Sequence, residues 1–243
     1  MKTRLKGLFM LLVLTVLLIP SVKASAAVQP AVPTGLGFYG QNSKNNDFIL
    51  SWNYDQNIMS YGANRYFGYQ VVVTTTKGKR IATFDKNVIN NISDMAKKDN
   101  KFYLYVKNSK MLKQAFKYKV RAYVYDEAGN KIYSKYSSTK VIVPRATISN
   151  FKAISTSSGK ISWKKISGAK NYTVYVSTDG GKKYKKKGTT KATSYTIKGM
   201  ELNKDYRVYI VANGIKIGKK NYNSTKPKWK SSNAADVYIY ITY

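Results

Sequence analysis

The segment ISWKKISGAKNYTVYVSTDGG (Ile161–Gly181), followed by TSYTIKGMELNKDYRVYIVA (Thr193–Ala212), decides the fold. Runs of β-branched and aromatic residues alternate with polar residues, and Gly, Asn, Asp and Ser separate the runs. A period of two is typical of strands that bury one face in a core. The segment therefore predicts an antiparallel all-β structure in this half of the chain.

The first half of the chain repeats this pattern. Five residues match at identical spacing: Leu112, Phe116, Tyr118, Val120 and Ala122 correspond to Leu202, Tyr206, Val208, Ile210 and Ala212. An early strand in each half also carries a tryptophan, Trp52 or Trp163. Such internal similarity indicates two copies of one structural unit.

These repeated residues are similar to those of the fibronectin type III family over nearly all of the mature chain. In the second half they follow the family's B, C, C′, E and F strands in order, and Tyr206 falls at the position of its tyrosine corner. The resemblance implies two tandem immunoglobulin-like β-sandwiches. In the first half Phe116 takes the corner position, and its side chain has no hydroxyl to make the usual corner hydrogen bond.

The predicted organisation has three parts: a signal peptide at 1–26, a first module with insertions at 27–145 and a second module at 146–243. The join VIVPRATI (Val141–Ile148) is short, and Pro144 stiffens it, which limits the angles between the modules. An insert in the first module, Asp85–Asn100, places apolar residues near helical spacing and predicts one short helix.

The N-terminus predicts export. Basic residues precede the apolar run Leu8–Ile19, which is shorter than the about 20 residues that a membrane span needs, and Ala24–Ala26 is a small-residue cleavage signature. We expect a secreted chain that begins at Ala27 and has no transmembrane span. An uncleaved N-terminal anchor is the alternative.

The chain is strongly basic, with 43 Lys+Arg, 11 Asp+Glu and a net charge of +32. Four of the basic residues and no acidic residue lie within 1–26, so the predicted mature chain carries +28. Solubility requires only a modest net charge, so this excess predicts attraction to polyanions. The candidates are a teichoic acid-like wall polymer, an acidic glycan, an anionic membrane or, less favoured, nucleic acid; a surface protein is a further possible partner.

The composition argues against catalysis. Cysteine and histidine are absent, which removes disulfides, thiol chemistry, the commonest general base and the commonest metal ligand. The few acidic residues show no pairing of the kind that a hydrolase needs, and no metal, phosphate-loop or nucleophile motif is visible. We predict a protein that is not an enzyme and has neither cofactor nor metal.

The alternation also assigns faces. Predicted inward are Tyr172, Val174, Val176, Tyr206, Val208 and Ile210 in the second half, and Tyr118, Val120 and Ala122 in the first. Predicted outward are Thr173, Tyr175, Ser177, Arg207 and Tyr209, and Lys117, Lys119, Arg121 and Tyr123. A slip by one residue would bury the charges, so the register is well specified.

One candidate site is the lysine run DGGKKYKKKGTT (Asp179–Thr190). Its DGG is a turn signal, so Lys182–Lys187 is predicted to form strand C′. Lys182, Tyr184 and Lys186 would face one side, and Lys183, Lys185 and Lys187 the other. The run is either a charged edge that prevents aggregation or a basic stripe beside Tyr175, Arg207 and Tyr209.

A second candidate site is the loop Asn213–Asp236. It carries Lys219, Lys220, Lys226, Lys228 and Lys230, with Tyr222 and Trp229 among them. Aromatic rings between cations can stack on sugars or bases while the lysines meet phosphate or carboxylate. The alternative is that Trp229 packs on the sandwich and the lysines are solvated.

These features predict a secreted, non-catalytic binding or adhesion protein of the cell surface that associates with an anionic wall polymer or another extracellular polyanion. Two alternatives stay open. One is a structural spacer or protein-interaction module whose charge serves solubility, and the other is a carbohydrate-binding accessory module.

Overall fold

The computed structural model describes residues 28–42, 47–61, 66–87, 95–98, 100–226 and 237–239, and the predicted signal peptide lies outside them. Strands dominate, which confirms the predicted all-β class. Within these ranges the helical elements are two 3-10 turns, η1 (Ile58–Ser60) and η2 (Ser109–Lys113). No helix of the described part is long and apolar enough to cross a membrane.

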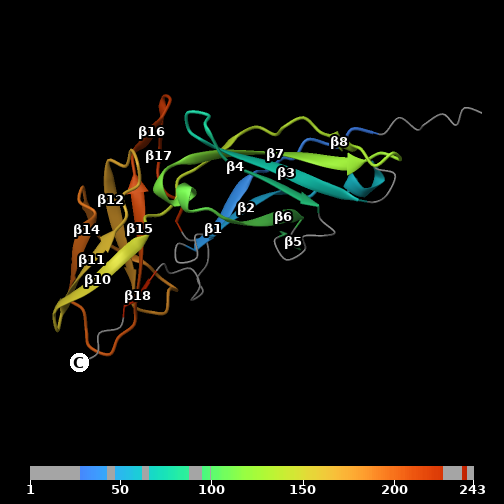
Figure 1. The fold of residues 1–243 in the computed structure, drawn as a ribbon. Coiled ribbons are helices and arrows are strands. Elements are labelled where there is room, and N and C mark those ends of the chain that lie inside the picture. Colours follow the sequence, from blue (N-terminus) through green and yellow to red (C-terminus); the bar gives the residue numbers. More distant parts are fainter. Residues whose placement is uncertain are drawn as a thin grey trace, which may run out of the picture.

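The first sandwich lies on the right in Figure 1 and has two antiparallel sheets. One has the order β1 (Gly37–Asn42), β2 (Asp47–Asn53), β6 (Lys101–Lys107) and β5 (Met95–Lys98). The other has the order β4 (Arg80–Asn87), β3 (Phe67–Thr75), β7 (Phe116–Tyr125) and β8 (Lys131–Tyr133), and β9 (Lys140–Ile142) also pairs with β7.

The second sandwich lies on the left in Figure 1 and repeats this arrangement. One sheet has the order β10 (Ile148–Ser155), β11 (Ser158–Trp163) and β14 (Ser194–Lys198). The facing sheet has the order β13 (Lys185–Thr190), β12 (Asn171–Ser177), β15 (Tyr206–Asn213) and β18 (Val237–Ile239). A hairpin of β16 (Ile215–Ile217) and β17 (Lys220–Tyr222) follows β15. Both sandwiches thus have the predicted fibronectin type III-like order.

The two cores are built around the same aromatic contact. Trp52 of β2 packs edge-on against Tyr69 of β3 at 5.0 Å between ring centroids, and Trp163 of β11 packs against Tyr172 of β12 at 5.4 Å. Every side chain predicted to point inward is buried. Large buried aromatic rings dominate the energetics of such cores, so this contact joins the two sheets of each sandwich.

The tyrosine corner is present in the second sandwich and replaced in the first. The Tyr206 hydroxyl accepts a hydrogen bond from the Glu201 N–H at 2.6 Å. Phe116 makes no such bond, but Tyr118, two residues further along β7, donates to the carbonyl oxygens of Gly37 (2.6 Å) and Ser51 (2.9 Å). A different tyrosine hydroxyl therefore fastens β7 to β1 and β2.

The predicted strand at Lys182–Lys187 is partly wrong, because β13 begins at Lys185. Asp179 Oδ1 accepts from the Ser177 hydroxyl (2.6 Å) and from the Lys183 N–H (2.9 Å). The Gly181 N–H donates to the same hydroxyl at 2.9 Å. These bonds hold residues 178–183 in a compact loop, so pairing starts later than the turn signal alone indicates.

The short helix predicted within Asp85–Asn100 is not formed at either described end. Residues 85–87 belong to β4, and Met95 belongs to β5, which pairs with β6. The other apolar residues behind that prediction, Val88, Ile89 and Ile92, lie outside the described residues. Cross-strand pairing therefore overrides the helical spacing at Met95.

Replacing Tyr118 by Phe tests the corner of the first sandwich. We expect the free energy of unfolding to fall by about 1–2 kcal/mol, because the carbonyl groups of Gly37 and Ser51 lose the hydroxyl proton that they share. Urea unfolding followed by fluorescence measures this change. Tyr105→Phe is the control, since Tyr105 is 44% exposed and should change stability by less than about 0.5 kcal/mol. Equal effects of the two variants would contradict the assignment.

Candidate functional site

Three cations follow one another on the outer face of β7. Lys117, Lys119 and Arg121 alternate with buried residues and are partly exposed, as predicted. We call these three residues the β7 stripe. Across the sheet they stand opposite Thr74, Val72 and Gln70 of β3.

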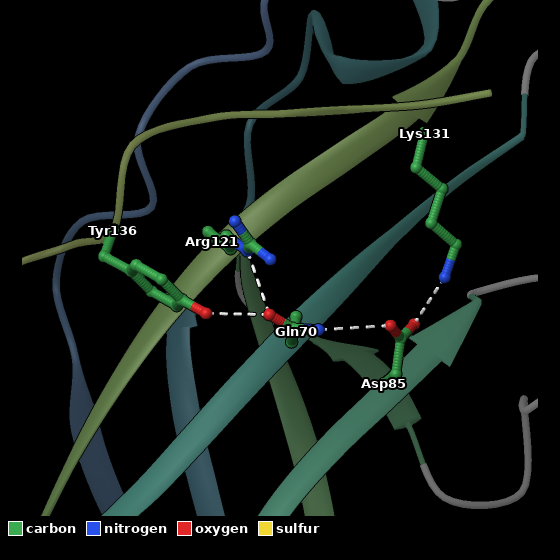
Figure 2. Close-up of polar contacts among 5 residues, drawn as sticks. All are labelled: Gln70, Asp85, Arg121, Lys131 and Tyr136. Atoms are coloured by element: carbon green, nitrogen blue, oxygen red, sulfur yellow. Dashed lines mark hydrogen bonds and ion pairs between the residues drawn. The ribbon is translucent and has the colours of Figure 1, made fainter.

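Arg121 is held in place from three sides. Its Nε donates to Gln70 Oε1 at 2.9 Å, and the Tyr136 hydroxyl donates to the same oxygen at 2.7 Å (Figure 2). The guanidinium carbon lies 3.7 Å from the ring centroid of Tyr133 and 4.8 Å from that of Tyr136. Hydrogen bonding and contact with two rings therefore fix the plane of the guanidinium.

Two lysines extend this arrangement. Lys119 Nζ lies 3.9 Å from the Tyr136 ring centroid, and Lys131 Nζ lies 4.1 Å from that of Tyr123. Together with Tyr133 and Arg121 these residues form what we call the cation–tyrosine layer. Each cation–ring contact at such a partly exposed site is worth about 0.5–1 kcal/mol.

Asp85 is the acidic residue of this face, and Lys131 pairs with it. Asp85 Oδ1 lies 3.0 Å from Lys131 Nζ, and Oδ2 accepts from Gln70 Nε2 at 3.4 Å (Figure 2). The carboxylate is thus engaged by Lys131 and by the Gln70 amide. Gln70 stands between Asp85 and Arg121, so the negative charge is not placed directly on the guanidinium.

Tyr123 was predicted to point outward and does lie on this face, but it is buried. Tyr133 and Tyr125 pack edge-on against it at 5.6 and 5.7 Å. Burial, with a further contribution from Asp85, raises the pKa of its hydroxyl. Strand alternation gives the face of a residue but not what covers that face.

The second sandwich carries three tyrosines on the equivalent face. Tyr175 and Tyr209 are cross-strand neighbours whose rings stack at 4.9 Å and 15°. Tyr184 leaves the preceding loop and packs on Tyr209 at 4.6 Å. We call these three residues the tyrosine cluster. Lys226 Nζ lies 5.0 Å from the Tyr175 ring, and Lys186 stands opposite Tyr175 on β13.

Arg207 and Tyr209, predicted to stand beside the lysine run, are on the predicted face but are almost fully buried, at 9% and 4% exposure. Tyr184 covers Tyr209 because the 178–183 loop turns it back over the sheet. The lysines of the run remain exposed: Lys182, Lys183, Lys185, Lys186 and Lys187. The exposed part of this predicted site is therefore its lysines.

The loop after β15 is described only in part. Tyr222 is half-buried and packs against the second core, whereas Lys226 is exposed. Lys228, Trp229 and Lys230 lie outside the described residues. The predicted role of this loop in binding stays a prediction.

No pattern in the sequence points to Arg145, whose side chain makes hydrogen bonds across the join. Its side chain is buried; its Nη2 donates to the Gln41 carbonyl oxygen (3.0 Å) and its Nη1 to that of Thr225 (3.4 Å). The Gln41 side-chain amide makes two hydrogen bonds with the Arg145 backbone. Its Oε1 accepts from the Arg145 N–H at 2.9 Å, and its Nε2 donates to the Arg145 carbonyl oxygen at 3.0 Å. One arginine thus connects β1 of the first sandwich with the segment after β17 of the second.

The join also completes a sheet of the second sandwich. Along one edge of β15, the Ala146 N–H donates to the Ile210 carbonyl oxygen (3.2 Å) and the Ser224 N–H donates to that of Ala212 (2.8 Å). On the same edge, β18 pairs with residues 206–208 of β15. The Ser224 hydroxyl donates to the Pro144 carbonyl at 2.6 Å. Residues before and after the predicted boundary at 145/146 therefore belong to one hydrogen-bonded network, which gives a physical basis for a restricted inter-module angle.

Side-chain packing crosses the same boundary. Val143 and Ala115 are buried in the core of the second sandwich, although both lie before residue 146. The Ser167 N–H donates to the Lys113 carbonyl at 2.9 Å, which links the end of η2 to the loop after β11. The exact domain boundary stays a prediction.

Metal-ligating residues do not cluster in the described part of the chain. Within it, no group of three or more Asp, Glu, His or Cys side chains could hold a metal ion. The arrangement offers fixed cations, tyrosine hydroxyls and ring edges, which are the groups of a binding surface.

Solved structures of tandem fibronectin type III domains are similar to this chain. The FN1-FN3 domains of chicken CNTN1 share 16% identity with a TM-score of 0.32, covering 81% of this chain and 67% of that one. A two-domain segment of chicken tenascin shares 16% identity with a TM-score of 0.30, covering 80% and 98%. No protein-family model and no curated protein matches the sequence. At these TM-scores the fold assignment rests on the strand order of the chain itself.

Replacing Arg145 by Lys tests the join. Lysine keeps the charge but cannot bond both carbonyl oxygens in the same way, so we expect the free energy of unfolding to fall by about 1.5–3 kcal/mol. Urea unfolding followed by tryptophan fluorescence measures this, because Trp52 and Trp163 report on separate cores. Arg80→Lys, at an exposed position, is the matched control. Equal stabilities of the two variants would contradict the role of Arg145.

Tyr209 gives a prediction for alkaline pH. Burial raises the pKa of its hydroxyl to about 12, helped by Tyr175 and Tyr184 and opposed by Arg145. The folded protein therefore keeps this proton longer than the unfolded chain, and the stability contribution is lost as the pH rises from about 10 through 12. Ultraviolet absorbance titration of the wild type minus that of Tyr209→Phe should show a midpoint near 12. A midpoint at about 10 would contradict the buried position.

Proposed function

We propose that this pair of fibronectin type III-like sandwiches is a secreted, non-catalytic binding protein of the cell surface, which associates with an anionic wall polymer of the teichoic acid type or with another extracellular polyanion. Sandwiches of this kind are typical binding and spacer modules. Because fold alone does not give function, the proposal depends on the charges that the fold carries.

The observation that carries the proposal is a set of cations held in position on the folded modules. In addition to the β7 stripe, Lys185, Lys186 and Lys187 are exposed on β13, and Lys182 and Lys183 are exposed in the loop that precedes it. The exposed residues Lys152, Lys160 and Lys198 share the outward side of β10, β11 and β14 on the other sheet of the second sandwich, and they add to the overall charge without belonging to the proposed binding rows. A folded surface of this charge attracts polyanions over a long range.

The acidic residues near these lysines are already engaged. Asp179 is hydrogen-bonded by Ser177 and by backbone N–H groups, which lowers the pKa of its carboxyl group. Glu201 pairs with Lys204 at 2.9 Å, and Asp85 pairs with Lys131 at 3.0 Å. These carboxylates neutralise or bond local partners, and the exposed lysine rows keep their positive charge for a ligand.

A second function, a spacer that holds other groups apart, is favoured by the join. The covalent join is reinforced by hydrogen bonds: the buried Arg145 side chain bonds β1 of the first sandwich, and Ala146 pairs with β15 of the second. A spacer needs this kind of fixed geometry, and binding to a polymer does not interfere with it. The two functions are separable, because Arg145 contributes to the join and the lysine rows do not.

Salt dependence tests the proposal. The predicted mature chain should bind immobilised teichoic acid, and affinity should fall on the order of 10³-fold between about 50 and 200 mM salt, because each lysine–anion contact releases a counterion. Surface plasmon resonance at several salt concentrations measures this. Neutral dextran is the control and should not bind. Affinity that ignores salt would contradict a charge-driven association.

A further inference from the structure

We propose that the β7 stripe is a track for a linear phosphodiester polymer, and that Arg121 is the subsite at which one phosphate is bound by a fixed guanidinium fork. This inference rests on the proposed function and names the site and the ligand chemistry. It concerns the outer face of the first sandwich and not the more conspicuous lysine run of the second.

The spacing of the stripe comes from strand geometry. Lys117, Lys119 and Arg121 are alternate residues of one strand and point to the same side. Alternate residues lie about 6.8 Å apart along an antiparallel strand. The stripe therefore presents one positive charge about every 7 Å in a straight file, which suits a polymer with one anion in each short repeat.

Arg121 is prepared for an anion before the ligand arrives. Gln70 holds its Nε, and the rings of Tyr133 and Tyr136 lie against the guanidinium. Among the described residues, its two Nη groups have no hydrogen-bond partner, and the side chain is partly exposed. A guanidinium whose plane is already fixed loses little conformational entropy on binding a phosphate with two parallel N–H donors.

The tyrosines of this face decide between kinds of polyanion. Arg121 lies against the Tyr133 and Tyr136 rings, and Lys119 also lies over Tyr136. These faces are therefore occupied by cations and are not free to stack on nucleic-acid bases, which is how proteins bind single strands without sequence preference. The face offers charge and hydrogen-bond donors to a backbone of phosphates.

An acidic glycan fits the stripe less well. A glycan with one carboxylate in each disaccharide places its charges further apart than the stripe does, so successive cations could not all be paired. A poly(glycerol phosphate) chain has one phosphodiester in each three-carbon repeat and can match a closely spaced file. The phosphodiester polymer is therefore the favoured ligand.

The test uses the predicted mature chain, synthetic poly(glycerol phosphate) and two variants, each with a matched control. Arg121→Lys keeps the charge but loses the fork, so we expect affinity to fall about tenfold with an unchanged slope of log K against log salt. Arg80→Lys makes the same substitution at the exposed start of β4 and should change affinity less than twofold. Lys119→Gln should make the slope of log K against log salt less steep by about one, whereas Lys160→Gln on β11 should leave the slope unchanged.

A further variant separates binding from stability. Gln70→Glu keeps the oxygen that accepts from Arg121 and Tyr136 but adds a negative charge beside the guanidinium. We expect it to weaken binding more than Arg121→Lys. The thermal midpoint and circular dichroism of each variant show that it is folded, so a loss of affinity reports on the site.

The outcomes are distinguishable. Wild-type affinity in Arg121→Lys and Gln70→Glu, or equal losses in Lys119→Gln and Lys160→Gln, would overturn the site while the proposed function stands. A wild-type chain that binds no polyanion would overturn both. Tighter binding of an oligothymidylate or of hyaluronate with the same number of charges, weakened by Arg121→Lys, would replace the phosphodiester polymer by that ligand and contradict the proposal.

Discussion

Packing of a tryptophan on one sheet against a tyrosine on the other is the contact on which the whole molecule depends. The pairs Trp52–Tyr69 and Trp163–Tyr172 lie at the centre of the two cores. The chain contains no cysteine, so no disulfide can take over this role. Because these rings fix which side of each strand is inside, they also fix which side carries the cations outside.

The same division of faces produced two different outer layers. On β7 the outward residues are cations, and Tyr133 and Tyr136 of the following segment lie against Arg121 and Lys119, which stay partly exposed. On β15 the corresponding layer has tyrosine on the strand, and Lys226 from the following segment lies over its neighbour Tyr175. At the position of Lys119 in the first repeat the second repeat has Tyr209, so a cation on one strand is replaced by a tyrosine on the other, while Arg207 keeps a cation at the position of Lys117.

Much of the fold was predictable because local pattern and tertiary structure agree. The period of two identified the inward residues of β7, β12 and β15, and the repeat located equivalent strands in both halves. The same pattern put Lys117, Lys119 and Arg121 on the outer face, where the structure has them.

What the sequence did not predict depends on contacts between distant segments. The burial of Arg207 and Tyr209 follows from side chains that cover the sheet, including Tyr184, and a strand pattern carries no information about a covering loop. The burial of Arg145 needs Gln41 and Thr225, which lie 104 and 80 residues away. Without those partners, a charged residue next to a proline in a short join is expected to be exposed to solvent.

The proposed binding is confined to cations held on particular faces and is not spread over the whole basic chain. A titration with poly(glycerol phosphate), followed by backbone amide chemical shifts, distinguishes these two cases. We expect shifts along β7, its neighbour β3 and the β13 edge, with the outward sides of β10 and β11 unchanged. Shifts of equal size on every lysine-bearing strand would contradict it.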